Sequence, residues 1–166
     1  MGVSRLYATA PVGVTDQPEF RNAAAAVDVP AGPDPAAGAI ALLVALKQLE
    51  RAFGRHERER WGPRELDLDL LIFGRARLAI DRPPAGVSLD SGKASQLLVV
   101  PHPAAHDRLF VLAPLADLAR GLTPPGWGES VETARRRRLA IEGPEAVCAI
   151  GNWDSNTRGW RLMTSR

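Results

Sequence analysis

Residues 65–73 constrain the fold most, because apolar side chains recur there at every second position: Leu66, Leu68, Leu70 and Ile72. Successive side chains of a β-strand point to opposite faces, so this spacing predicts a strand with one buried face. Asp67 and Asp69 then share the other face, about 7 Å apart along the backbone. The segment therefore predicts a sheet that displays two carboxylates on one side.

A helix is predicted before this strand. Asp34 is suited to cap its N-terminus, Pro35 suits the first helical position, and Gly54 is a natural stop. The apolar positions along it are spaced by four, three and four residues: Leu42, Leu46, Leu49 and Phe53. We expect these to form the buried face. Charged and polar residues are expected on the other sides: Lys47, Gln48, Glu50 and Arg51.

The rest of the chain alternates between short strands and helices. Apolar patterning predicts further strands at residues 4–10, 19–29, 77–80 and 146–150, and residues 97–100 form another apolar segment. Helices are predicted at residues 107–118 and 133–141, and residues 81–95 and 121–128 are rich in loop-forming residues. Together with a length of 166 residues, this order predicts one α+β domain spanning residues 1–166.

Composition excludes several classes of protein. Hydrophobic residues make up 45% and charged residues 24% of the chain, which is typical of a globular protein. No apolar run approaches the ~18 residues of a membrane span, and the N-terminus does not resemble a signal peptide. Cys148 is the single cysteine, so an internal disulfide and a multi-cysteine metal site are excluded, and a cytoplasmic location is expected. A net charge of +2 does not by itself indicate a nucleic-acid partner.

The two aspartates are candidates for metal binding. Mg²⁺ is commonly held by one or two carboxylates together with substrate phosphates and water, although Asp67 and Asp69 could equally form a solvated strand face. Four arginines precede them: Arg55, Arg58, Arg60 and Arg64. Such arginines suit phosphoryl or pyrophosphoryl transfer, and the alternative is a surface cluster neutralised by nearby acids. Trp61, followed by Gly62 and Pro63, indicates stacking on a ring or a lid.

This stretch, which reads Arg60-Trp-Gly-Pro-Arg-Glu-Leu-Asp-Leu-Asp69, resembles the signature of the 6-hydroxymethyl-7,8-dihydropterin pyrophosphokinase (HPPK) family. Tyr7-Ala-Thr-Ala-Pro-Val-Gly13, Asp16-Gln-Pro-Glu-Phe-Arg-Asn22 and Pro101-His102 match the family in the same order, so the resemblance covers residues 4–118. It implies a ferredoxin-like antiparallel sheet with helices on its faces. The implied activity is ATP-dependent pyrophosphoryl transfer to the hydroxymethyl group of 6-hydroxymethyl-7,8-dihydropterin in folate biosynthesis, with release of AMP.

The resemblance also implies roles for individual residues. Asp67 and Asp69 correspond to Mg²⁺ ligands, Arg55 and Arg64 to contacts with the transferring phosphates, and Trp61 to a residue that closes over the substrates. The implied ATP contacts are Glu50, His102 and Arg108. The implied pterin pocket comprises Thr9, Val12, Phe20, Asn22 and Phe110. In it Phe20 and Phe110 would sandwich the ring and Asn22 would bind its polar edge, although packing in the core is the alternative for the two phenylalanines.

The chain also departs from the family pattern. The family normally begins with a strand ending in Gly-Ser-Asn and a helix, so the resemblance implies an N-terminally incomplete fold whose activity is open. A start assigned too far downstream, a degenerate copy, and replacement of the strand by residues 147–152 are the explanations considered. Residues 145–166 are unassigned.

Two other functional classes remain open. One is an inactive remnant that binds pterin or nucleotide without turnover. The other is a nucleic-acid binder that uses residues 135–138, four consecutive arginines, although a solvated turn is the simpler interpretation of that run. We expect a monomer whose partners are its small-molecule substrates, without membrane or nucleic acid.

Overall fold

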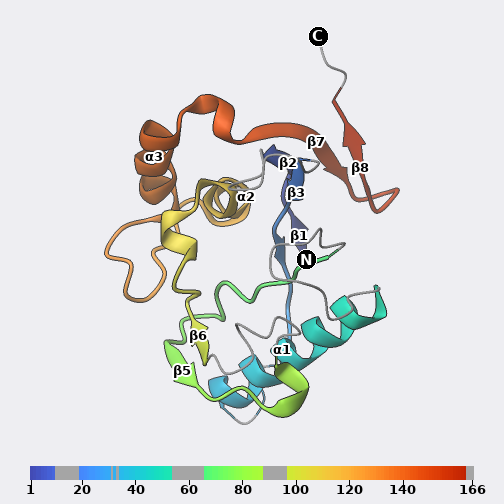
Figure 1. Cartoon of the computed structure of the whole chain (residues 1–166), viewed down its shortest axis with the longest axis vertical. Coiled ribbons are helices and arrows are strands. Elements are labelled where there is room, and N and C mark those ends of the chain that lie inside the picture. Colours follow the sequence, from blue (N-terminus) through green and yellow to red (C-terminus); the bar gives the residue numbers. More distant parts are fainter. Residues whose placement is uncertain (10–18, 31, 33, 54–65, 88–96, 164–166) are drawn as a thin grey trace. The chain divides into compact units, whose positions relative to one another are not determined.

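The computed structural model of the chain has an α+β fold and describes residues 1–9, 19–30, 32, 34–53, 66–87 and 97–163 (Figure 1). Two compact units are distinguished: unit 1 comprises Met1–Asp28 with Ala104–Arg166, and unit 2 comprises Val29–Pro103. Each unit is described by itself. Among the described residues, no helix is long and apolar enough to cross a membrane.

Unit 1 contains a four-stranded antiparallel sheet with the order β3-β2-β7-β8. These strands are β2 (Leu6–Thr9), β3 (Phe20–Asn22), β7 (Cys148–Asp154) and β8 (Gly159–Leu162). All four residues of β2 are buried, as expected for a strand with neighbours on both sides. The strands predicted at residues 4–10 and 146–150 are therefore confirmed in outline, and β7 continues four residues further, to Asp154.

The strand predicted at residues 19–29 is interrupted. Its second part, β4 (Ala25–Ala26), pairs with β1 (Gly2–Val3) rather than with β2. The pairing register changes by one residue between Val3 opposite Ala25 and Tyr7 opposite Asn22. Ser4 bridges this irregularity, because its backbone N–H donates to the Ala24 carbonyl and its hydroxyl accepts from the Ala24 N–H.

Two helices complete unit 1, α2 (Leu109–Ala119) and α3 (Val131–Glu142). They are flanked by the short 3₁₀ helices η3 (Ala105–Asp107) and η4 (Pro144–Ala146). Helix α2 packs against β2 and α3 (Figure 1). Its side chains Leu109 and Leu112 are buried. Both helices predicted from the sequence are confirmed.

A polar cluster joins β2 to α2. The Arg5 guanidinium and backbone N–H donate to the Asp117 carboxylate, and the Tyr7 hydroxyl donates to Asp117 Oδ2 at 2.9 Å. Burial of the phenol and its hydrogen bond to Asp117 raise the pKa of Tyr7 to about 12. Burial opposes ionisation of Asp117, but the hydrogen bonds from Arg5 outweigh it and hold the pKa of this carboxyl below its ordinary value.

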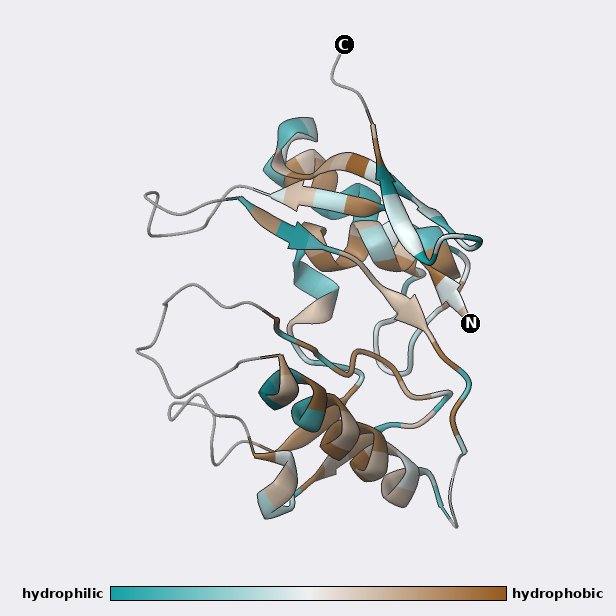
Figure 2. Cartoon of the chain, turned by 90° about the vertical axis from the view of Figure 1, so that its right-hand side faces the viewer, coloured by the Kyte–Doolittle hydropathy of each residue, from teal (hydrophilic) through white to brown (hydrophobic). Residues whose placement is uncertain are grey.

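Unit 2 is built on α1 (Pro35–Ala52), whose N-terminus is capped as predicted by Asp34 accepting from the Ala37 N–H at 2.8 Å. Strands β5 (Leu78–Ile80) and β6 (Leu98–Val100) form an antiparallel pair, and η1 (Pro84–Gly86) packs against α1. The buried core consists of Ala39, Leu43, Leu70, Leu98 and Val100. Figure 2 shows hydrophobic residues along α1 and the strands beside it.

The face that α1 buries is not the predicted one. Leu49 and Phe53 are exposed, and Leu42 and Leu46 are half-buried at the edge of the core. The fully buried side chains include Leu43, but also Lys47 and Glu50. Two charged residues can be buried here because they pair with each other and with a backbone segment opposite the helix.

The strand predicted at residues 65–73 is also wrong, since no strand is assigned to residues 66–73 and Glu65 lies outside the described residues. A strand needs a ladder of backbone hydrogen bonds to a neighbour. Here side chains of α1 bind the backbone of Leu68, and the His102 N–H donates to the Leu71 carbonyl at 2.8 Å. The partner of β5 is β6 instead.

Candidate functional site

The two candidate metal ligands lie on one side of their segment. Asp67 and Asp69 are exposed, Leu66 and Leu68 are half-buried, and Leu70 belongs to the core of unit 2. The alternation inferred from the sequence is therefore correct as a pattern of exposure for residues 66–70, although no strand produces it. It does not extend to residues 71–73, which are all half-buried, and there Phe73 rather than Ile72 packs against the core. The core side chains turn both carboxylates towards solvent.

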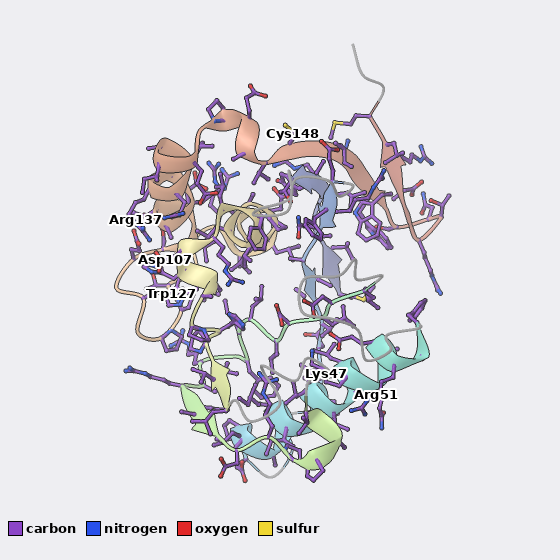
Figure 3. The ribbon with its side chains drawn as sticks, viewed as in Figure 1. Lys47, Arg51, Asp107, Trp127, Arg137 and Cys148 are labelled. Carbon is purple, nitrogen blue, oxygen red and sulfur yellow. The ribbon has the colours of Figure 1, made fainter. Side chains whose placement is uncertain are left out.

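Helix α1 holds the residue between these carboxylates. The Leu68 N–H donates to Glu50 Oε1 at 2.6 Å, and the Lys47 ammonium donates to the Leu68 carbonyl at 3.1 Å. Lys47 also binds Glu50 Oε1 at 2.8 Å, and the two residues are only 5% and 1% exposed. Figure 3 labels Lys47 on α1. A buried ion pair thus binds both polar groups of the Leu68 backbone.

A cleft in unit 2 lies beside the carboxylates and is lined in part by Asp69, Lys47 and His102. Its other lining residues are mostly apolar: Leu43, Leu68, Leu70, Arg82, Leu97, Leu98, Val99 and Pro103. The Nε atom of Arg82 is buried and has no hydrogen-bond partner in the part of the chain that the structure describes. The cleft thus combines apolar side chains with a carboxylate, two cationic side chains and an imidazole.

The residues present suit Mg²⁺ rather than a softer metal. No group of three or more His, Cys, Asp or Glu side chains arranged for a metal occurs within the described ranges. Mg²⁺ often takes only one or two carboxylates from a protein, with phosphates and water as its remaining ligands. Asp67 and Asp69, two exposed oxygen donors two residues apart, fit that requirement.

The candidate pterin residues described by the structure gather in unit 1. The Asn22 amide donates to Thr9 Oγ1 at 2.9 Å, and Phe20 lies opposite Thr9 in the register of β2 and β3. Helix α2, which carries Phe110, contacts both strands. Phe20 is 42% exposed, so it is not a core residue, and an exposed aromatic ring is available for stacking.

The other predicted site residues are distributed as follows. Glu50, Asp67, Asp69 and His102 belong to unit 2, and Arg108 belongs to unit 1, where its guanidinium lies 5.8 Å from the centre of the Phe110 ring. Val12, Arg55, Trp61 and Arg64 lie outside the described residues.

The four arginines at positions 135–138 all have carboxylate partners. Arg135 and Arg136 bind Glu132, Arg137 binds Glu129 and Asp107, and Arg138 binds Glu142. Figure 3 shows Arg137 beside Asp107 and Trp127. The hydrogen bond from Arg135 lowers the pKa of Glu132 to about 2, against the opposing effect of burial, and Arg136 adds to it. The run lies in helix α3, so the solvated turn expected from the sequence is wrong, and neighbouring carboxylates balance the guanidinium charges.

Two residues that line the cleft, Lys47 and Arg82, were not predicted from the sequence as site residues. The signal for Lys47 was its spacing: it follows Leu43 by four residues and precedes Glu50 by three, so all three share one helix face. Arg82 carried no such signal, because it precedes two prolines in a loop.

The fold and the site together define a class of protein: an α+β protein that carries a pair of carboxylates suited to Mg²⁺ beside a cleft. Residues 1–120 match the family model described as 7,8-dihydro-6-hydroxymethylpterin-pyrophosphokinase (HPPK). The chain belongs to the HPPK family.

Named relatives agree with this assignment. A 2-amino-4-hydroxy-6-hydroxymethyldihydropteridine pyrophosphokinase of Pseudomonas aeruginosa is 42% identical over 125 residues, which is 75% of this chain and 64% of that protein. One of Bacillus subtilis is 37% identical over 118 residues, 71% of this chain and 58% of that protein. A mitochondrial folate synthesis bifunctional protein of Arabidopsis thaliana is 44% identical over 115 residues, 69% of this chain and 17% of that protein. The matched part of the chain thus spans less than two thirds of each of these relatives.

Proposed function

We propose that this protein transfers pyrophosphate from ATP to the hydroxymethyl group of 6-hydroxymethyl-7,8-dihydropterin and releases AMP. The observation that carries the proposal is the exposed pair Asp67 and Asp69, of which Asp69 lines a cleft together with Lys47, Arg82 and His102. The names of the relatives and the family match support the same reaction.

In this reaction the substrate hydroxyl oxygen bonds to the β-phosphorus of ATP. The bond from that phosphorus to the oxygen bridging to the α-phosphorus breaks, AMP leaves with the electron pair, and the hydroxyl proton passes to solvent. No protein nucleophile is needed, so catalysis depends on positioning and on neutralising phosphate charge. Mg²⁺ bound at Asp67 and Asp69 would supply part of that neutralisation.

The remaining roles are divided between the two units. In unit 2, Glu50 and His102 serve the nucleotide, and Arg82 at the cleft is an additional cation for its phosphates. In unit 1, Thr9, Asn22, Phe20 and Phe110 serve the pterin and Arg108 the nucleotide. Family likeness adds four further residues to the proposed active site: Arg55, Arg64, Trp61 and Val12. A ferredoxin-like arrangement within a single domain is part of the same proposal.

The test is AMP formation from ATP and 6-hydroxymethyl-7,8-dihydropterin in the presence of Mg²⁺. We expect Asp67→Asn and Asp69→Asn to lower turnover by about 10²–10³-fold, as loss of a transition-state charge contact does. Their melting temperatures should stay close to that of the native chain, because both side chains are exposed.

The matched control is Asp81→Asn, an exposed aspartate of unit 2 that does not line the cleft. It should leave AMP formation unchanged. Binding of ATP and pterin by the native chain without any AMP release would contradict the proposed turnover and favour the remnant alternative.

A further inference from the structure

The ion pair of α1 meets the metal-site segment at its midpoint. The Leu68 N–H belongs to the peptide group that joins Asp67 to Leu68, and the Leu68 carbonyl belongs to the group that joins Leu68 to Asp69. Glu50 accepts from the first group at 2.6 Å, and Lys47 donates to the second at 3.1 Å. Both peptide planes between the two aspartates are therefore held from one helix.

These two planes restrict the directions in which the aspartate side chains leave the backbone. Each Cα lies in one held plane, so rotation about the single bond that joins Cα to that plane is what remains to change the direction of its Cα–Cβ bond. Residues 66–73 form no strand, so no strand ladder holds Leu68 from a neighbouring strand. Hydrogen bonds to charged groups are about twice as strong as neutral ones, which suits them to replace a ladder.

The geometry points to Lys47 as a positioning residue for the metal-binding carboxylates, acting with Glu50 through the backbone of Leu68. The inference rests on the proposed function, since it concerns the Mg²⁺ site of that reaction. It gives Glu50 a second role beside the nucleotide contact that family likeness implies. Partners behind metal ligands typically change metal affinity by about 10–100-fold when removed.

The chain offers a close control in Arg51, four residues after Lys47 on the same helix. Its guanidinium also donates to backbone carbonyls, those of Ala85 at 3.3 Å and Val87 at 3.5 Å, but it is exposed and does not line the cleft. Figure 3 labels both side chains. Comparing variants of Lys47 and Arg51 therefore distinguishes the effect of a cation bound to the metal-site segment from the effect of a cation bound to another loop.

The test variant is Lys47→Met combined with Glu50→Gln. It removes the donor to the Leu68 carbonyl and keeps an acceptor for the Leu68 N–H, and it leaves no unpaired buried charge. Binding of α,β-methylene-ATP is measured by calorimetry, once with Mn²⁺ and once with EDTA. The gain in affinity that Mn²⁺ provides, which is the ratio of the affinities with Mn²⁺ and with EDTA, should fall about tenfold. Any loss of the direct nucleotide contact of Glu50 lowers both affinities and cancels in this ratio.

A rescue variant distinguishes positioning of the carboxylates from a general effect on the structure. Lys47→Gln combined with Glu50→Gln restores a neutral donor and should recover most of the lost gain. If the Lys47→Met and Glu50→Gln double variant does not melt cooperatively, the Lys47→Gln and Glu50→Gln double variant takes its place. Its Mn²⁺-dependent gain in affinity should then be about threefold smaller than that of the native chain. Arg51→Met should keep the full Mn²⁺ gain.

The possible failures are distinguishable. If Asp67→Asn abolishes the Mn²⁺ gain but the Lys47 and Glu50 variants keep it, or lose affinity equally with Mn²⁺ and with EDTA, the positioning role is overturned and the proposed function stands. If the native chain shows no Mn²⁺ gain, the metal site fails, and both the proposed function and this inference are overturned.

Discussion

At the scale of single residues, the role of a side chain here depends on what it can reach. Lys47 and Glu50 are buried although charged, because each finds a partner in the other and in Leu68. Phe20 is large and apolar but remains 42% exposed at the start of β3. A large aromatic side chain with much of its surface exposed contributes less to stability than a buried one, which favours a ligand-binding role.

We predict that Phe20→Ala weakens pterin binding with little effect on stability. Loss of one stacking ring removes about 1 kcal/mol of interaction together with some apolar contact, so KM for the pterin should rise about tenfold, with a smaller change in kcat. The measurements are steady-state kinetics and a melting curve.

The control for this prediction is Phe53→Ala, which removes a phenylalanine that is 64% exposed and follows α1 in unit 2. KM for the pterin should not change in that variant. A similar rise in both variants would mean that Phe20 has no specific contact with the pterin.

At the scale of elements, β2 and α2 are joined by groups that titrate. Asp117 accepts hydrogen bonds from Arg5 and Tyr7 and packs at the junction of strand and helix. Its pKa is lower in the folded chain than the ordinary value of 3.8. As the pH falls, the Asp117 carboxylate is therefore protonated at a higher pH in the unfolded chain than in the folded chain.

We predict that this carboxylate contributes stability above about pH 3.8 and that the contribution is lost as the pH falls through its lower, folded pKa. The free energy of unfolding of Asp117→Asn should be lower at neutral pH and should fall less steeply in acid. Urea unfolding between pH 7 and the acid limit measures both effects.

Asp28→Asn serves as the control, because Asp28 is a fully exposed carboxylate of the same unit. The free energy of unfolding of Asp28→Asn should depend on pH in the same way as that of the native chain. An Asp117→Asn curve parallel to the native one would show that this carboxyl does not link stability to pH.

At the scale of the whole molecule, unit 1 combines distant parts of the sequence. Strand β7 lies between β2 and β8, so the most buried strand of the sheet depends on residues near the other end of the chain. The Trp160 indole N–H also donates to the Ser4 carbonyl at 3.1 Å. Unit 2, by contrast, is formed by the continuous range Val29–Pro103.

We predict that a chain ending at Glu145 loses the stability of unit 1, because β2 then has an unpaired edge. Hydrogen exchange of the Leu6–Thr9 amides should become faster by orders of magnitude, while protection of Leu43 and Val100 in the core of unit 2 changes little. A chain ending at Met163 keeps β7 and β8 and is the control. Unchanged protection of β2 in the shorter chain would contradict this dependence.

The sequence alone determined features that depend on local chemistry: the Asp34 cap and the start of α1, the helices α2 and α3, the alternation that exposes Asp67 and Asp69, and the motifs shared with the HPPK family. Such features follow from residues a few positions apart. Tertiary structure decided the rest. Only the fold shows that β7 pairs with β2, that β6 rather than residues 66–73 pairs with β5, and that Lys47 and Glu50 face inward. The physical reason is that backbone groups accept whichever partner the fold brings within reach, and at Leu68 that partner is an ion pair on a helix.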